Sequence, residues 1–263
     1  MTYKHLCTEA AMIALRAGDF LHRELGKVSG LSIEEKSFNQ LVSYVDRQAE
    51  EMLVEGLRAL LPEATFLTEE ATVVAEDGEW QWIIDPLDGT TNFLHEVPVF
   101  AVSVALKYRR EIVVGIVYEV NRRECFYAWR GGGAWCNDER IRVSKTSELS
   151  QSLIATGFPT SNFERLPQYI GALQNLLRHT RGVRRLGAAS VDLAYVACGR
   201  FDAFFEYSLQ PWDVAAGILL VQEAKGRVGD FKGGDDCLFG QEMLACNANL
   251  YPIVLPYIQQ AFQ

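Results

Sequence analysis

The chain has 263 residues, 49% hydrophobic and 22% charged, which excludes a disordered or fibrous protein and fits one large α/β unit or two compact halves. Lysine and arginine number 25 against 34 aspartates and glutamates, and the net charge of −9 argues against a general nucleic-acid-binding protein. An anionic ligand would need local attraction, from a metal ion, a helix N-terminus or a few lysines.

Helices and strands alternate irregularly in the first half of the chain. Apolar residues at helical spacing predict one helix from Leu6 to Leu21 and a second over 40–61. The short apolar run 80–84 predicts a strand that ends in a turn at Asp85-Pro86. Residues 99–107, 111–120 and 124–129 predict a meander of strands. The glycines at 131–133 are interpreted as a hairpin turn, because no Lys-Ser/Thr pair follows as a P-loop needs.

From residue 153 onward the pattern becomes one of alternating strands and helices. Strands are predicted at 153–157, 183–186 and 201–207, helices at about 163–178, 189–198 and 214–224, and segments 243–246 and 252–262 close the chain. This change predicts two halves: residues 1–145, a helix pair with an antiparallel sheet, and residues 146–263, an α/β unit. No linker separates them, so we expect them to share a cleft.

The cysteine and histidine patterns further limit the class of protein and the kind of metal site that the sequence can form. The six cysteines form no C-x-x-C pair and no regular framework, so free thiols in a reducing compartment are expected. The four histidines form no H-x-H or H-E-x-x-H pattern, which argues against a histidine-built zinc site. The first residues lack an apolar core, and no run approaches the roughly 18 apolar residues of a membrane span. We therefore expect a cytoplasmic protein with no membrane partner.

The segment from Asp85 to Phe93 is the most informative part of the sequence. It carries two carboxylates, Asp85 and Asp88, three residues apart across a proline. On a straight strand such positions point to opposite faces, so the two can converge only where the chain folds back. Converging carboxylates repel each other unless a cation or shared proton intervenes, and oxygen ligands of this type suit Mg²⁺. The alternative is an Asx turn that caps the next helix.

Two signatures give the chain a family resemblance. The run WIIDPLDGTTNF over 82–93 and the run PWDVAAG over 211–217 resemble, in order and separation, those of the inositol monophosphatase family of magnesium-dependent phosphatases. Other matches extend from about Lys36 to Gly234, nearly the whole chain. The resemblance implies an α/β fold, layered as an α/β/α/β/α sandwich of the sugar-phosphatase type found in fructose-1,6-bisphosphatase-like proteins, and a homodimer.

The resemblance also implies a site for two or three Mg²⁺ ions. Glu69, Asp85 and the backbone carbonyl of Leu87 would hold the first ion, and Asp85, Asp88 and Asp213 the second. One ion would lower the pKa of its bound water to make the nucleophile, and the other would stabilise the oxygen of the departing alcohol.

Catalytic roles follow from the same resemblance. Thr90 and Asp46 match the family's water-orienting pair, with Asp46 polarising the Thr90 hydroxyl, and Glu69 acts beside them. Bound phosphate would meet the helix N-terminus near Gly89 and Thr90. Lys36 matches the family lysine that precedes the second helix, with an ordinary exposed lysine as the alternative.

Substrate contacts are implied at two further places. Glu206 matches the family glutamate that accepts hydrogen bonds from sugar or cyclitol hydroxyls. Ala188 and Ala189 lie in the segment that resembles the family's substrate loop, and Ala188 replaces the usual hydroxyl residue. In the late E-A-G-G stretch, Lys225 replaces a small residue.

The implied reaction is hydrolysis of a small phosphate monoester, with inositol monophosphate as the first candidate and lithium as an expected inhibitor. Alternatives within the superfamily are phosphatases of 3′-phosphoadenosine 5′-phosphate, histidinol phosphate or sugar phosphates. The alternative from another class is a non-catalytic regulatory protein on the same fold.

Overall fold

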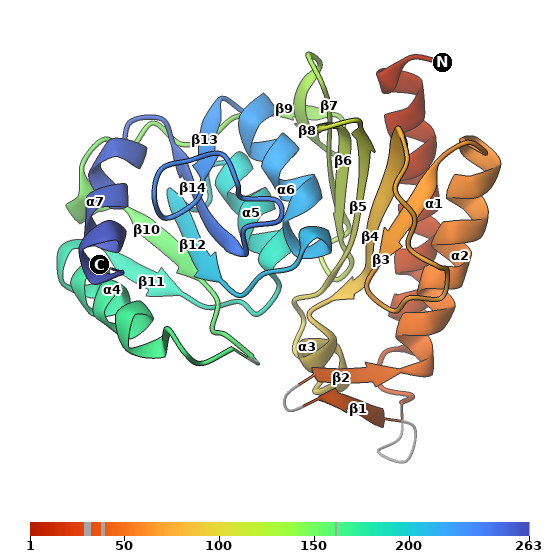
Figure 1. Cartoon of the computed structure of the whole chain (residues 1–263), viewed down its shortest axis with the longest axis horizontal. Coiled ribbons are helices and arrows are strands. Elements are labelled where there is room, and N and C mark those ends of the chain that lie inside the picture. Colours follow the sequence, from red (N-terminus) through yellow and green to blue (C-terminus); the bar gives the residue numbers. More distant parts are fainter. Residues whose placement is uncertain (29–32, 38–39, 161, 263) are drawn as a thin grey trace.

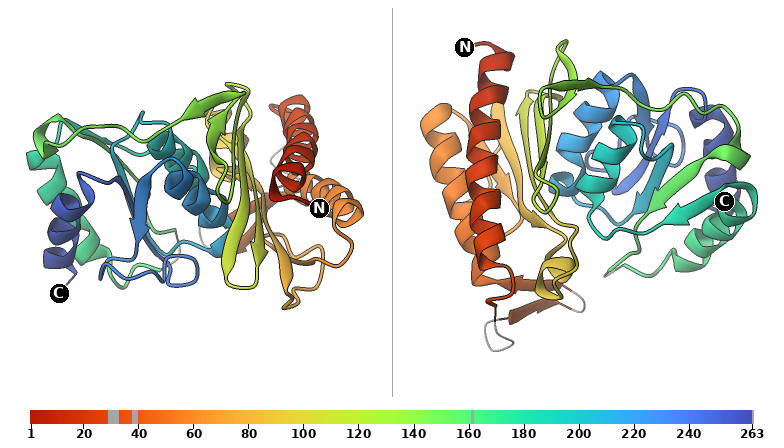
Figure 2. Two further views of the ribbon diagram at one scale, coloured as in Figure 1. Left: turned by 90° about the horizontal axis from the view of Figure 1, so that it is seen from above. Right: turned by 180° about the vertical axis from the view of Figure 1, so that it is seen from behind.

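The computed structural model describes residues 1–28, 33–37, 40–160 and 162–262 and shows five layers (Figure 1). Helices α1 (Tyr3–Glu24) and α2 (Tyr44–Leu60) form the first layer, and a seven-stranded sheet forms the second. Helices α5 (Ala189–Ala197) and α6 (Pro211–Glu223) lie between that sheet and a five-stranded one. Helices α4 (Leu166–His179) and α7 (Tyr251–Ala261) cover the outer face (Figure 2). The predicted α/β/α/β/α fold is confirmed.

The seven-stranded sheet contains the predicted meander. Its order is β3-β4-β5-β6-β7-β8-β9. The sheet is antiparallel except at one edge, where β3 pairs with β4 in parallel. The strands are β3 (Thr65–Thr68), β4 (Trp80–Asp88), β5 (Ala101–Tyr108), β6 (Glu111–Glu119), β7 (Glu124–Trp129), β8 (Gly133–Cys136) and β9 (Glu139–Ile141). The three glycines lie in the β7–β8 hairpin, as predicted.

The five-stranded sheet is mixed, with the order β11-β10-β12-β14-β13. Its parallel pairs join β10 to β11 and β12, and its antiparallel pairs join β14 to β12 and β13. The strands are β10 (Leu153–Thr156), β11 (Gly182–Arg184), β12 (Ala203–Tyr207), β13 (Gly226–Gly229) and β14 (Glu242–Asn247). The two sheets are built from separate stretches of the chain, and the proposed boundary at residue 145 stays a prediction.

Helix α2 begins four residues later than the apolar pattern predicts. Residues Gln40–Ser43 form β2, which pairs with β1 (Ile33–Ser37). Ser43 ends this hairpin and caps the helix: its hydroxyl oxygen accepts from the Val45 amide at 3.1 Å, and its own amide donates to the Asp46 carboxylate at 2.8 Å. This capping box fixes the helix start, because it satisfies amides that have no partner within the helix.

Strand β4 differs most from its prediction, because it continues to Asp88 where a turn at Asp85-Pro86 was expected. Asp85 pairs with Ser103 and Asp88 with Ala101. Between these two pairs β4 therefore advances by three residues while β5 advances by two. The extra residue is a β-bulge, a position that tolerates Pro86. Since Ser103 and Ala101 are two residues apart and share a face, the bulge turns both carboxylates toward the same side of the sheet.

Three apolar clusters join the layers. One fills the space between α1, α2 and the large sheet, the second surrounds α5 and α6 between the sheets, and the third lies under α4 and α7. All six cysteines are free thiols, as expected. Among the described helices, none combines the length and apolar character needed to cross a bilayer.

Lys225 follows the last turn of α6 with a positive φ of 72°, a backbone conformation that glycine adopts without strain. We therefore expect Lys225→Gly to raise the free energy of unfolding by about 1 kcal/mol. Chemical denaturation measures this change, and Lys225→Ala is the matched control because it removes the charge and keeps the strain. Equal stabilisation by both variants would contradict the backbone explanation.

Candidate active site

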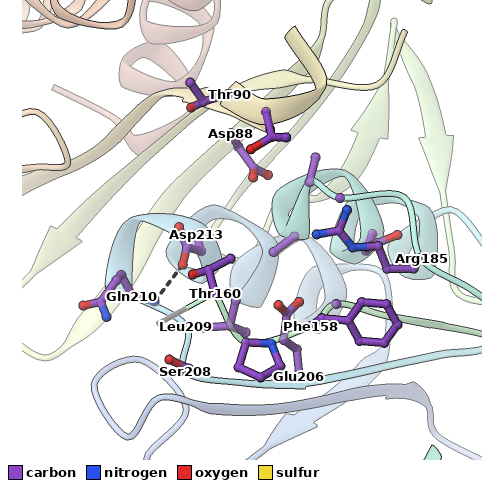
Figure 3. Close-up of a pocket in the computed structure, with 18 of the residues that line it drawn as sticks. Asp88, Thr90, Phe158, Thr160, Arg185, Glu206, Ser208, Leu209, Gln210 and Asp213 are labelled. Atoms are coloured by element: carbon purple, nitrogen blue, oxygen red, sulfur yellow. Dashed lines mark hydrogen bonds between the residues drawn. The ribbon is translucent and has the colours of Figure 1, made fainter. Parts of the chain in front are cut away.

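A cavity of about 290 Å³ lies between the end of β4 and the end of β12, beside the N-terminal ends of α5 and α6. Its upper wall in Figure 3 comes from the end of β4 and the short helix α3 (Thr90–Leu94), and its other walls come from the N-terminal ends of α5 and α6 and from β12. The polar residues among its lining are Glu69, Asp88, Thr90, Thr91, Thr160, Arg185, Asp192, Glu206, Ser208, Gln210 and Asp213. Five of these residues are acids and one is a base, so the lining is predominantly acidic.

Four of the predicted residues form a carboxylate cluster beside this cavity. Asp85 is 2% exposed, and burial raises its pKa well above the ordinary range, with further increases from the charges of Glu69, Asp88 and Asp213. A hydrogen bond between the side chains of Asp85 and Glu69 acts in the same direction. These four side chains come from β3's end, β4 and α6, so three separate chain segments place them together.

Asp88 also connects the end of β4 to α5. Its Oδ2 accepts hydrogen bonds from the Ser190 amide at 2.7 Å and the Ser190 hydroxyl at 2.5 Å. Burial raises the Asp88 pKa, while Ser190, the Ala189 amide and Arg185 oppose that rise. Ala188, at the start of α5, has no side chain that can cap the helix, and Asp88 supplies the missing acceptor from the other sheet.

Asp213 is held by the first turn of α6. Its Oδ2 accepts from the Gln210 amide at 2.7 Å, the contact dashed in Figure 3. Burial is the largest cause of a strongly raised Asp213 pKa, followed by the charges of Asp88 and Glu69. The helix N-terminus compensates part of this repulsion, since its dipole favours negative charge.

The donor set fits magnesium in its chemistry. All four side chains are carboxylates, and hard oxygen ligands with excess negative charge are the environment that Mg²⁺ prefers. As they stand, no three His, Cys, Asp or Glu side chains of the described chain are arranged to hold a metal ion. Carboxyl oxygens of Asp85, Asp88 and Asp213 instead accept hydrogen bonds from backbone amides.

Thr90 and Asp46 are in contact. The Thr90 hydroxyl lies 3.2 Å from Asp46 Oδ1 and 3.0 Å from the Leu87 carbonyl oxygen. Asp46 is 1% exposed, and its other oxygen holds the start of α2 through Ser43. Burial raises the Asp46 pKa, and the hydrogen bonds from Ser43 and Thr90 oppose that rise. The packing of α2 against β4 therefore fixes the position of the Thr90 hydroxyl.

Gly89 begins α3 with a φ of 94°, and a Cβ there would lie 3.1 Å from the Val99 carbonyl oxygen and 3.3 Å from that of Gly187. Only glycine fits both the conformation and the space. The close approach brings Gly89 and Thr90 to the cavity opposite the loop that precedes α5.

The predicted substrate residues line the same cavity. Ala188 and Ala189 lie at the start of α5, and Glu206 lies on β12, where burial raises its pKa to about 8. A Cβ on Gly157 would lie about 2.0 Å from a Glu206 carboxylate oxygen, so the glycine makes room for this acid. Lys36 is on β1, and its side chain lies outside the described part of the structure.

Two cavity residues, Arg185 and Asp192, were missed in the sequence. Arg185 is exposed and lies over the Phe158 ring, with 5.7 Å between the guanidinium carbon and the ring centroid. Asp192 is 1% exposed and is the one acid in α5. A lone acid inside an apolar helical segment was the available signal, because such residues are rarely buried without a reason.

Known proteins resemble the chain over nearly its full length. A model of the inositol monophosphatase family matches residues 4–263. Nus factor SuhB of Pseudomonas aeruginosa is 43% identical over 256 residues, covering 94% of both proteins. An inositol-1-monophosphatase of Mesorhizobium japonicum is 42% identical over 248 residues, 94% of this chain and 93% of that protein. The solved structure of extragenic suppressor protein suhB from Bartonella henselae has a TM-score of 0.90 at 42% identity, covering 95% of this chain and 96% of that one.

Proposed function

Because the chain belongs to the inositol monophosphatase family, we propose that it hydrolyses a small phosphate monoester with Mg²⁺, and that inositol monophosphate is the first candidate substrate. The observation that carries this proposal is the carboxylate cluster beside the cavity, in which burial and then the charges of Glu69, Asp88 and Asp213 raise the pKa of Asp85. Repulsion of this kind at a cavity is typical of a site built for cations or protons.

Glu69, Asp85, Asp88, Asp213 and the Leu87 carbonyl are the proposed Mg²⁺ ligands. When bound, Mg²⁺ would neutralise these charges, activate a water and stabilise the departing alcohol oxygen. The amide contacts of the aspartates hold their side chains in fixed orientations before any ion arrives. Such prior orientation lowers the cost of binding.

Thr90 and Asp46 are the proposed pair that orients the attacking water, with Glu69 beside them. The Thr90 hydroxyl has one proton, and Asp46 and the Leu87 carbonyl both lie within reach to accept it. With the proton directed at either acceptor, the lone pairs of the Thr90 oxygen face away and can accept a hydrogen bond from water. Thr90 would then fix the direction from which that water approaches the phosphorus.

The substrate would lie across the cavity. Gly89 and Thr90 offer backbone amides at the start of α3 to the phosphate, and Ala188 and Ala189 line the opposite loop. Glu206, on the far side of the cavity from Asp88 in Figure 3, would accept hydrogen bonds from hydroxyls of the alcohol.

The direct test is phosphate release by the purified protein from a panel of esters. The panel contains inositol monophosphate, sugar phosphates, histidinol phosphate and 3′-phosphoadenosine 5′-phosphate, each assayed with Mg²⁺, with EDTA, and with Mg²⁺ plus lithium. Mg²⁺-dependent release supports the proposal, and the best ester identifies the substrate. No release from any ester would contradict it. The homodimer and the cytoplasmic location stay predictions.

The second candidate is a role that depends on a protein partner, with or without hydrolysis. The observation that favours it is the name Nus factor SuhB on relatives as similar as those named inositol-1-monophosphatase. An intact protein with no activity on the ester panel would favour this candidate over the enzyme.

Mg²⁺ should stabilise the folded protein, because a ligand that binds only the native state shifts the folding equilibrium toward it. At one hundred times the dissociation constant the gain is about 2.7 kcal/mol, which thermal melts in EDTA and in Mg²⁺ would show as a higher midpoint. Glu119→Gln, at a buried acid outside the cavity lining, should keep the full increase. An unchanged midpoint in the wild type would contradict a metal site in this cluster.

A further inference from the structure

Asp192 is a buried acid of the cavity wall that the proposed reaction does not use. It lies on α5, one turn beyond Ala188, with Val191 and Leu193 as apolar neighbours. It is 1% exposed and still forms part of the lining. The fold therefore places an acid inside an apolar layer with access only toward the cavity.

One oxygen of this acid has no partner. Asp192 Oδ1 is fully buried and accepts no hydrogen bond from the described part of the protein. Buried polar oxygens almost always accept at least one hydrogen bond. An oxygen without one has lost its hydrogen bonds to water on folding and has gained none within the protein, which costs free energy. Asp192, which lines the cavity, is therefore one hydrogen bond short within the described protein.

The surroundings of Asp192 define which donor fits. Burial raises the Asp192 pKa well above its ordinary range, the charges of Glu206 and Asp88 raise it further, and Arg185 opposes them. Figure 3 shows Glu206 and Phe158 across the cavity from Asp88 and Thr90, with Arg185 at the side. The wall around Asp192 carries the charges of Glu206 from one end and of Asp88 from the other. Its excess of acids favours a neutral group with hydrogen-bond donors over a second anion.

We propose that Asp192 is a specificity-determining residue that accepts a hydrogen bond from a hydroxyl of the substrate's alcohol portion, beside the contact made by Glu206. The inference rests on the proposed hydrolysis and adds a second residue to the contact with the alcohol. Two carboxylates on different elements, α5 and β12, can receive two hydroxyls of one ring, which an alcohol with a single oxygen cannot supply. The same pair of acids disfavours an alcohol that carries another phosphate.

The test compares two esters that share the phosphate and differ in the alcohol. We would measure kcat/KM for myo-inositol 1-phosphate and for 4-nitrophenyl phosphate, which has no hydroxyl donors, in wild type, Asp192→Ala and Asp192→Asn. For Asp192→Ala we expect the ratio of the two constants to fall by about 10-fold, the loss typical of one hydrogen bond. Asp192→Asn keeps the shape and an acceptor, so its ratio should fall less.

Controls separate this role from support of the fold. Glu119→Gln also alters an acid that is 1% exposed, but one outside the cavity lining, and it should leave the ratio unchanged. Equal losses on both esters in Asp192→Ala would overturn the proposal. A loss found with histidinol phosphate and absent with myo-inositol 1-phosphate would also overturn it, because the contact would then be to an ammonium group.

A protein that does not hydrolyse phosphate esters would give a result different from the loss of the Asp192 contact alone. If the wild type releases no phosphate from either ester, hydrolysis is contradicted, and calorimetric titration with myo-inositol in Mg²⁺ still tests Asp192. Binding that is about tenfold weaker in Asp192→Ala would support the contact. Equal binding by both proteins, or no binding to either, would overturn it.

Discussion

Asp213→Asn is expected to remove most phosphatase activity while the protein stays folded. The asparagine carbonyl can still accept the hydrogen bond that Asp213 Oδ2 receives from the Gln210 amide at 2.7 Å, so the start of α6 keeps its cap. What is lost is a negative charge on a proposed metal ligand. Metal-based charge stabilisation is worth several kcal/mol, which corresponds to a loss of roughly two to four powers of ten in kcat.

Steady-state kinetics at saturating Mg²⁺ would measure this loss, with circular dichroism as the check on folding. Asp230→Asn is the matched control: Asp230 also accepts backbone amides, from Lys232 and Gly234 at 2.8 Å each, and it lies outside the cavity lining. It should retain wild-type kcat. Asp213→Asn activity within about threefold of wild type would rule out the ligand role, since a lost metal ligand costs far more.

Thr90→Val should lower kcat by about 10² to 10⁴, the usual worth of a positioned proton-transfer group, with little change in substrate binding. Valine keeps the shape of threonine and removes the hydroxyl that lies between Asp46 and the Leu87 carbonyl. Thr90→Ser restores a hydroxyl and should recover much of the rate.

A double-mutant cycle tests whether Asp46 acts through Thr90. Asp46→Asn should reduce kcat much less in the Thr90→Val background than in wild type, because residues that act as one unit are not additive. Asp46 also holds the start of α2, and the melting temperature reports that separate role. Fully additive losses in kcat would show that the two residues act independently.

Local patterns in the sequence predicted the helices and strands well where the buried apolar residues recur at the regular spacing of a helix or a strand. The helix expected from Leu6 to Leu21 is α1, and the strand predicted at 124–129 is β7. Helix α2 was placed too early, because Leu41 and Val45 continue the helical spacing backward across Ser43. The cap that Ser43 and Asp46 form together overrides that spacing.

The cavity could be predicted only in part. Asp85 and Asp88 were recognised as a converging pair, but the bulge that turns them together depends on pairing with β5, a contact that local sequence does not encode. The contact between Thr90 and Asp46 joins residues 44 positions apart and was expected from resemblance alone. Asp192 has no motif, and its burial beside Glu206 appears only when α5 packs against β12.

The bulge in β4 also decides which strand register the chain can adopt. With a regular ladder between β4 and β5, the odd spacing would turn Asp88 away from Asp85 and into the apolar layer beneath α1 and α2. A carboxylate there would have no partner and would cost several kcal/mol. The competing register is thus penalised by the same acid that the cavity uses. Correct pairing of β4 with β5 therefore brings Asp85 and Asp88 together, and the packing of α6 adds Asp213 to them.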